Sequence, residues 1–266
     1  MGRLAGNCMG IAVLAALLVA ALVPILRVPL LVVLVAGVWL LPGRPRVRWA
    51  LAAATPVALI LVWGDLVGSR LLTDRFTCAD PLSTVAWLRV AEAAAVLGIV
   101  LLLARRLGTK LRVLGLARPT RGEALVALVA IAVVPIPSLY LGAILAEPFF
   151  GPIHLDLSQP LAVVPALALA IANGTMEEVA YRGALMAWMS RVTAPAVALI
   201  GQAVVFGAAH TGSDFVASPL PVVLAVVAGG LLAGVVVRRT GSLWMPIVVH
   251  IALDVPLYYA AACRLP

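Results

Sequence analysis

The sequence predicts an all-α protein, a polytopic bundle of eight or nine transmembrane helices. The first observation is composition: 64% of the 266 residues are hydrophobic, 11% are charged, and the mean hydropathy is +1.15. A soluble domain has about 45–50% apolar and about 25% charged residues, so this chain has too few polar side chains to cover a water-soluble particle. The second observation is that apolar runs of about 20 residues, the length that crosses a bilayer, fill nearly the whole chain.

The apolar runs define the expected helices one after another. In chain order they are 8–26, 28–42, 49–68, 83–104, 123–145, 160–190, 194–210, 219–237 and 243–262. The second run is short, and only Arg27 and Pro29 separate it from the first, which leaves the count at eight or nine. The first run lacks a small-residue cleavage site followed by a polar segment, so we expect a retained helix and no cleaved signal peptide.

The net charge of +8 and the pI near 10.4 reflect basic residues in short loops between apolar runs. These loops are 43–48, 105–121 and 238–239, whereas the alternate loops carry Asp65, Asp74, Asp80, Glu147, Asp156 and Asp214. By the positive-inside rule the basic loops face the cytoplasm. We therefore expect a multi-pass protein of the cell membrane with its amino terminus in the cytoplasm, and a lipid bilayer as its partner instead of a nucleic acid.

Polar residues divide the chain into two parts. Residues 1–110 form almost purely aliphatic helices without a recognised motif, while intramembrane polar residues gather in residues 120–262. Cys8, Cys78 and Cys263 stand alone and form no CxxC pair, so neither a disulfide framework nor a zinc knuckle is expected.

The stretch ANGTMEEVAYRGALMAW places three charges in an apolar run, and each costs roughly 2.5–3.5 kcal/mol at the centre of a bilayer. Glu178 and Arg182 are four residues apart, so they lie on one helix face and can pair. Glu177 has no such partner, because Asn173 and Tyr181 stand four residues before and after it. An unpaired acid inside the membrane is a candidate functional residue.

Two later stretches supply histidines at a compatible depth. FGAAHTGSD contains His210, and SLWMPIVVHIALD contains His250 and Asp254, which share a helix face. If the chain turns near Val192, Glu177 and His210 lie roughly 23 and 27 Å from the turn, within one helical turn of each other. These four residues are therefore expected to line one cavity part-way through the membrane.

Three motifs resemble those of a known family. EEVAYRG (177–183), FGAAH (206–210) and HIALD (250–254) are similar in order and spacing to the EExxxR, FxxxH and HxxxN or HxxxD motifs of the CPBP family. This family comprises intramembrane endopeptidases: the type II CAAX prenyl proteases and bacterial relatives called Abi or bacteriocin-processing proteins. GSLWMPIVVH (241–250) resembles the segment that leads into the third motif, and the resemblance covers about residues 120–262.

The resemblance implies hydrolysis of a peptide bond in or near the membrane. It assigns water activation to Glu177 with His210, and stabilisation of the oxyanion to His250 and Asp254. Glu178 and Arg182 would brace their helix, and Phe206 would pack beneath His210. Asp254 departs from the family, since many members have Asn there and an ionised carboxylate cannot donate a hydrogen bond. It would serve if protonated, by orienting His250, or as a metal ligand.

The role of a metal stays open at this point. The chain has no HExxH motif, the spacing that places two zinc ligands on one helix face. Glu177, His210, His250 and Asp254 would be the ligands of a divalent metal such as zinc, while a metal-free water activated by glutamate is also proposed for the family.

Other interpretations remain. Buried Glu and His also form proton relays, so a proton-coupled transporter is one alternative, although no inverted repeat is visible. A catalytically silent immunity or scaffold protein of the same fold is another. Arg89 and Glu92 are spaced to pair with each other, and His154 is expected in a solvated loop. The substrate, a peptide or a membrane-protein segment, is not revealed, nor is its prenylation.

Overall fold

The structure is a computed structural model that describes residues 3–41, 43–64, 84–138, 144, 158, 160–211 and 220–262. Several predictions concern residues outside these ranges. They are those for Cys78, Cys263 and His154, and for the acidic loop residues Asp65, Asp74, Asp80, Glu147, Asp156 and Asp214.

The described residues form helices and no strands, which confirms the predicted all-α class. The helices are α1 (Arg3–Leu22), α2 (Arg27–Leu40), α3 (Pro45–Trp63), α5 (Thr84–Arg106), α6 (Arg121–Val133), α8 (Val163–Glu177), the π-helix η5 (Glu178–Met186), α9 (Ala187–Met189), α10 (Pro195–Ala208), α11 (Leu220–Thr240) and α12 (Trp244–Ala262). Three short 3-10 helices are η1 (Pro24–Leu26), η3 (Leu111–Leu114) and η4 (Pro160–Ala162).

Each of the nine predicted apolar runs is helical over most of its described part. Six helices in that part of the chain are long and apolar enough to cross a membrane: Leu4–Leu22, Pro45–Trp63, Trp87–Arg106, Arg121–Ser138, Pro160–Met189 and Leu220–Thr240. The apolar helices Pro24–Leu40, Pro195–Ala208 and Trp244–Tyr259 are shorter. The multi-pass character is therefore confirmed, whereas the expected eight or nine full spans are not all present as long helices.

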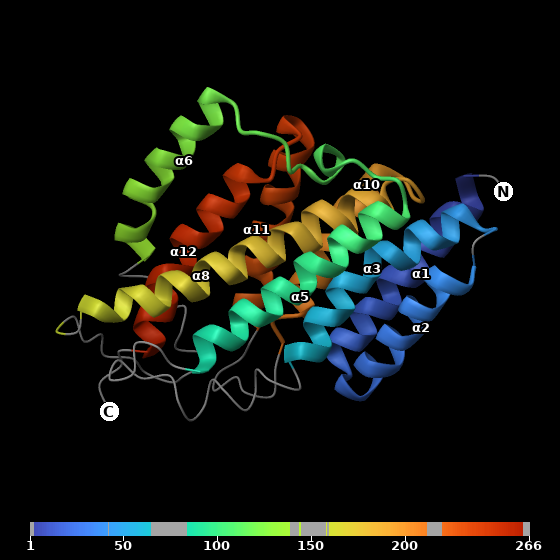
Figure 1. The fold of residues 1–266 in the computed structure, drawn as a ribbon, viewed down its shortest axis with the longest axis horizontal. Coiled ribbons are helices and arrows are strands. Elements are labelled where there is room, and N and C mark those ends of the chain that lie inside the picture. Colours follow the sequence, from blue (N-terminus) through green and yellow to red (C-terminus); the bar gives the residue numbers. More distant parts are fainter. Residues whose placement is uncertain are drawn as a thin grey trace.

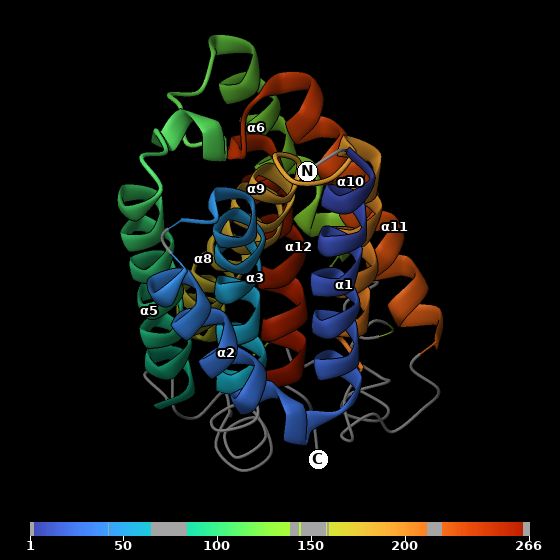
Figure 2. The same ribbon diagram turned by 90° about the vertical axis from the view of Figure 1, so that its right-hand side faces the viewer.

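The helices form one bundle around the continuous segment α8–η5–α9 (Figure 1). Helices α5 and α12 pack against α8, while α3 and α10 pack against η5. Helix α6 lies at the edge of the bundle and packs against α12, as Figures 1 and 2 show. The segment with the three charged residues is thus the central element of the molecule.

One large hydrophobic cluster joins the amino-terminal helices to the later ones. Trp188 of α9 and Tyr181 of η5 are among the largest fully buried side chains. Trp49 of α3 packs edge-on against Trp188, with 6.2 Å between ring centroids. A row of buried alanines on α3 leaves little side-chain bulk there, so the backbones of α3 and η5 can come close.

The predicted continuous helix over 160–190 contains a π-helix from Glu178 to Met186. A π-helix has i→i+5 hydrogen bonds and is wider than an α-helix; such segments are frequent at functional sites. The transition falls between the two adjacent glutamates, Glu177 and Glu178. The apolar pattern alone gives no sign of this change.

The basic loop after α5 folds onto the start of α12. Leu243 donates its backbone N–H to the carbonyl of Gly115 (3.0 Å), and the Trp244 indole donates to the carbonyl of Ala117 (2.5 Å). Gly115 has φ +75°, and a Cβ there would lie 2.9 Å from Leu243 Cγ, so both the conformation and the space require glycine. These contacts fix η3 beside the end of the bundle.

Candidate active site

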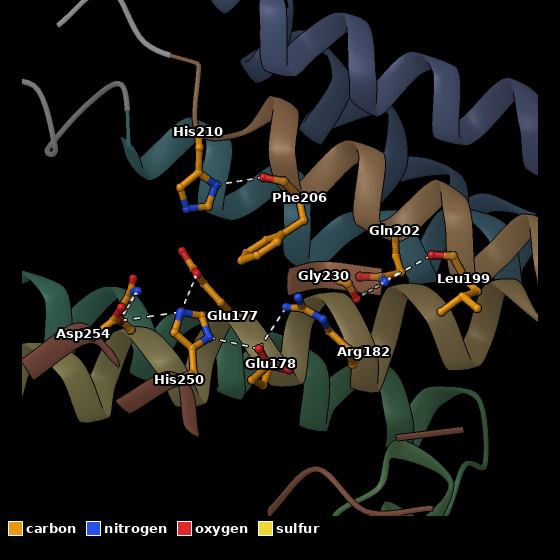
Figure 3. A network of polar contacts seen from close by, with 11 residues as sticks. Glu177, Glu178, Arg182, Leu199, Gln202, Phe206, His210, Gly230, His250 and Asp254 are labelled. Carbon is orange, nitrogen blue, oxygen red and sulfur yellow. Dashed lines mark hydrogen bonds and ion pairs between the residues drawn. The ribbon is translucent and has the colours of Figure 1, made fainter. Parts of the chain in front are cut away.

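The candidate site lies where α8 meets η5, α10 and α12 (Figure 3). Glu177 is the last residue of α8, and Glu178 is the first of η5. His250 and Asp254 project from α12, one helical turn apart. The structure therefore places the three predicted motifs around one group of polar side chains.

His250 is the centre of this group because carboxylates approach both of its ring nitrogens. Its Nδ1 lies 3.0 Å from Glu178 Oε1, and its Nε2 lies 3.5 Å from Glu177 Oε2 and 3.6 Å from Asp254 Oδ2. The adjacent glutamates point in different directions from the helix, yet they reach opposite nitrogens of the same ring (Figure 3).

The contact between His250 and Glu178 fixes the position of one proton. Nδ1 and Oε1 are at hydrogen-bond distance, and an ionised carboxylate can only accept, so Nδ1 carries the hydrogen. Nε2 is then the nitrogen that faces Glu177 and Asp254. The family resemblance assigned Glu178 only a bracing role, but its contact with Nδ1 also holds the orientation of the His250 ring.

Glu177 is buried, with 8% of its surface exposed, and it retains an unused acceptor. Its Oε2 has no hydrogen-bond partner in the described part of the chain, although the ionic contact with His250 Nε2 is close. Buried polar atoms normally have a partner. This carboxylate oxygen can therefore accept a hydrogen bond from water or from a substrate.

Asn173 is a member of the site to which the sequence analysis gave no role. Its Nδ2 donates to Asp254 Oδ2 at 2.9 Å, and both side chains are buried. The signal was present in the sequence, because Asn173 stands four residues before Glu177 and so lies on the same helix face. Its partner, 81 residues further along the chain, depends on the packing of α12 against α8.

His210 lies just past the end of its predicted helix, since α10 ends at Ala208. Its Nδ1 donates to the carbonyl of Phe206 at 2.8 Å, because a carbonyl oxygen can only accept. Nε2 is then the nitrogen left for other partners. Figure 3 shows the ring on the side of α10 that faces Glu177 and His250.

Phe206 lies beneath His210, as predicted, with 4.9 Å between their ring centroids. The Arg182 guanidinium lies over the Phe206 ring, 4.2 Å from the ring centroid. Arg182 also pairs with Glu178 Oε1 at 3.0 Å, which is the predicted i,i+4 ion pair. Only 1% of Arg182 is exposed, so its charge is buried in the bundle, where the charge of Glu178 compensates it.

The predicted pair of Arg89 and Glu92 is present on α5, with 2.5 Å between Nη1 and Oε2. This pair accounts for two charges in an apolar helix. Gln202, which the sequence analysis did not single out, is fully buried and donates to the carbonyls of Leu199 and Gly230. It therefore ties α10 to α11 near the site.

Across the residues that the structure places, no group of three His, Cys, Asp or Glu side chains is arranged to hold a metal ion. His250 Nδ1 is engaged by Glu178, and His210 Nδ1 by a backbone carbonyl. Each ring therefore has only its Nε2 left for a metal, the arrangement found where the other ring nitrogen of a ligating histidine donates to a carboxylate or a carbonyl.

Fold and site together define a class: a multi-pass helical protein with a Glu/His/Asp cluster buried between its helices. Residues 158–256 match the family described as type II CAAX prenyl endopeptidase Rce1-like. This match supports the family that the three motifs predict, and with it a membrane protease. No curated protein and no solved structure matches the chain.

Proposed function

We propose that the chain is an intramembrane endopeptidase that hydrolyses a peptide bond with a water activated by Glu177 and His210. One observation carries the proposal. The buried Glu177 Oε2 has no hydrogen-bond partner among the described residues, and it lies 3.5 Å from His250 Nε2 within a family of endopeptidases. A carboxylate beside imidazoles is the arrangement that general acid–base hydrolysis requires.

In the proposed first step, water donates one hydrogen bond to Glu177 and the other to His210 Nε2. The His210 tautomer supports this, because Nδ1 donates to the Phe206 carbonyl and leaves Nε2 as the acceptor. Glu177 removes a proton as the water oxygen bonds to the carbonyl carbon of the substrate. The C=O π bond breaks, and its electrons move to the carbonyl oxygen.

The oxyanion then needs a hydrogen-bond donor. We assign this role to His250 Nε2–H, with the ring carrying protons on both nitrogens. Glu178 holds Nδ1 from the other side, so the ring cannot turn without losing that bond. In the second step the C–N bond breaks, and Glu177 returns its proton to the leaving amine.

Asp254 is proposed as a positioning residue for His250. Its Oδ2 accepts from Asn173 and lies 3.6 Å from His250 Nε2. The hydrogen bond from Asn173 of α8 holds the Asp254 side chain in place, and Asp254 in turn holds the His250 ring. The role suits a carboxylate, which cannot donate to the oxyanion unless it is protonated.

The test is proteolysis by the full chain in liposomes, with a membrane-associated peptide library as substrate and mass spectrometry as readout. Glu177→Gln and His210→Ala should each lower kcat by about a hundredfold or more, since general acid–base groups contribute about 10²–10⁴. Glu123→Gln is the matched control. Glu123 is also buried and caps α6 through Thr120, a role that glutamine fills as well.

Cleavage by Glu177→Gln at the wild-type rate would refute the assignment. No cleavage by the wild type, with the fold intact, would favour the silent scaffold; substrate-dependent proton flux without cleavage would favour the transporter. The same assay after treatment with a chelator examines the metal: the metal-free reaction keeps its rate, whereas a reaction that needs zinc loses it and regains it when zinc is added.

A further inference from the structure

A pocket lies away from the Glu177–His250 cluster, where η3, η5 and the end of α11 meet. It encloses about 180 Å³. Its polar lining comes from Arg112, Arg182, Ser190 and Arg238. The volume is below the roughly 300 Å³ at which sites for drug-sized ligands begin, so the pocket suits a small chemical group.

Every ionisable side chain that lines this pocket is an arginine. Arg112 and Arg238 are exposed at its edge, and neither forms an ion pair with any residue that the structure places. The unpaired charges of Arg112 and Arg238, with no acid in the lining, therefore favour an anion. Arginine is also the side chain best suited to phosphate, because its planar donors can bind two oxygens at once.

Arg182 supplies an independent observation. It is 1% exposed, and its Nε has no hydrogen-bond partner within the described ranges. Its Nη1 is the atom closest to Glu178, so the ion pair leaves Nε unused. A buried donor without a partner is costly, and an anion in the pocket that Arg182 lines would satisfy it.

The location indicates the source of the anion. Arg238 is in the last turn of α11, one of the helices long enough to cross a membrane. Arg112 lies in the loop that follows another such helix, which ends at Arg106. Basic side chains at this level of a bundle meet lipid headgroups. We propose that the pocket binds the phosphate of an anionic lipid headgroup.

The test uses the purified full chain in neutral detergent, without any substrate, so its outcome does not depend on proteolysis. Phosphatidylglycerol is titrated against diacylglycerol, which has the same chains but no phosphate, and against inorganic phosphate alone. Native mass spectrometry gives the Kd, and the unfolding midpoint gives the linked stabilisation. Phosphatidylglycerol should bind saturably and raise the midpoint, while diacylglycerol should not.

Two double variants with equal loss of charge separate the pocket from general surface charge. Arg112→Ala/Arg238→Ala should weaken phosphatidylglycerol binding about tenfold or more, because charge-assisted hydrogen bonds to phosphate are lost. Arg118→Ala/Arg239→Ala removes two exposed arginines outside the pocket and should leave Kd within about twofold. Equal weakening by both variants would show that the pocket is not the binding site. Binding of free phosphate as tight as that of the lipid would overturn the lipid assignment.

Discussion

Glu178 connects the two charged features of the molecule, because its Oε1 lies 3.0 Å from both Arg182 Nη1 and His250 Nδ1. Removing Glu178 alone would leave the buried Arg182 without its partner, which costs about 3–5 kcal/mol. A loss of activity in such a variant would therefore not distinguish a bracing role from a role in holding His250. Variants that also replace Arg182 avoid this difficulty.

We predict that Glu178→Leu/Arg182→Met lowers kcat about 10- to 100-fold with little change in KM. It deletes the acceptor of His250 Nδ1–H, and a hydrogen bond to a charged group contributes about 1.5–3 kcal/mol. Glu178→Gln/Arg182→Met also removes both charges but keeps an oxygen that can accept from Nδ1, so it should stay within about tenfold of wild type.

Unfolding midpoints are measured for both double variants alongside the kinetics. Replacing both members of a buried ion pair is often neutral or stabilising, so the midpoints should remain close to that of the wild type. If the two variants were equally stable and equally impaired, the proposed hold on His250 through Nδ1 would be incorrect.

Asp254 gives a second prediction for a single residue. In Asp254→Asn the side-chain oxygen can keep the place of Oδ2, where it accepts from Asn173 Nδ2 and faces His250 Nε2. Activity should therefore stay within about tenfold of wild type. Asp254→Ala leaves the buried Asn173 donor unpaired, so kcat/KM should fall about a hundredfold, which corresponds to the upper part of the penalty for an unsatisfied buried group.

The measurement is kcat/KM for the two variants on one peptide substrate. If Asp254→Asn is as inactive as Asp254→Ala, the reaction needs the negative charge at this position and not the hydrogen bond from Asn173. This comparison also shows whether the departure from the Asn of many family members has a catalytic consequence.

At the scale of elements, periodicity predicted which segments are helical but not how they depart from a regular helix. The i,i+4 rule correctly paired Glu178 with Arg182. The sequence could not reveal the π-helix that begins at Glu178, because a nearly continuous apolar run has no clear period that would distinguish the two helix types. The apolar run 194–210 also placed His210 inside a helix, whereas α10 ends at Ala208. Contacts between Glu178 and His250, or Asn173 and Asp254, depend on tertiary packing.

The crossing of α10 and α11 depends on a glycine. A Cβ on Gly230 would lie 3.3 Å from Ala203 Cα, Arg182 Nη2 and Phe206 Cδ1 at once, so no single movement relieves the three contacts. A Cβ on the preceding Gly229 would meet nothing within 4 Å. Gly229 is therefore a matched control for a substitution at Gly230.

We predict that Gly230→Ala destabilises the fold by about 1–3 kcal/mol, the usual cost of overpacking. The same substitution at Gly229 should be neutral or slightly stabilising, because alanine is the better helix former. Unfolding in detergent, followed by circular dichroism, measures both. Equal midpoints for the two variants would show that α10 and α11 can separate without cost at this crossing.

At the scale of the whole molecule, composition was sufficient to predict a multi-pass helical bundle, because a chain with so few polar side chains must place most of its surface in lipid and not in water. It could not fix how far each helix extends. Two of the nine predicted runs, those of α2 and α10, form helices of fewer than 18 residues within the described segments, and they pack against the longer ones. Nor could it show that the aliphatic amino-terminal part shares one core with the part that carries the site.

The structure brings the predicted basic loops together at one end of the bundle. Arg48 Nη2 donates to the carbonyl of Arg106 at 3.5 Å, which joins the start of α3 to the end of α5. The loop after α5 in turn contacts the start of α12 through Leu243, next to the end of α11. All these loops must therefore lie on one side of a membrane, and their charge predicts the cytoplasmic side.

This orientation predicts the accessibility of the two ends of α11. In a chain with its three cysteines replaced by serine, Leu220→Cys and Arg239→Cys place one thiol at each end of that helix, and Lys110→Cys marks the basic loop. A membrane-impermeant maleimide added to intact cells should label Leu220→Cys alone, and after permeabilisation it should label all three. Labelling of Lys110→Cys and Arg239→Cys in intact cells, with Leu220→Cys protected, would reverse the orientation. Labelling of both ends of α11 would contradict a spanning helix, and with it the placement of the arginine pocket at the headgroup level.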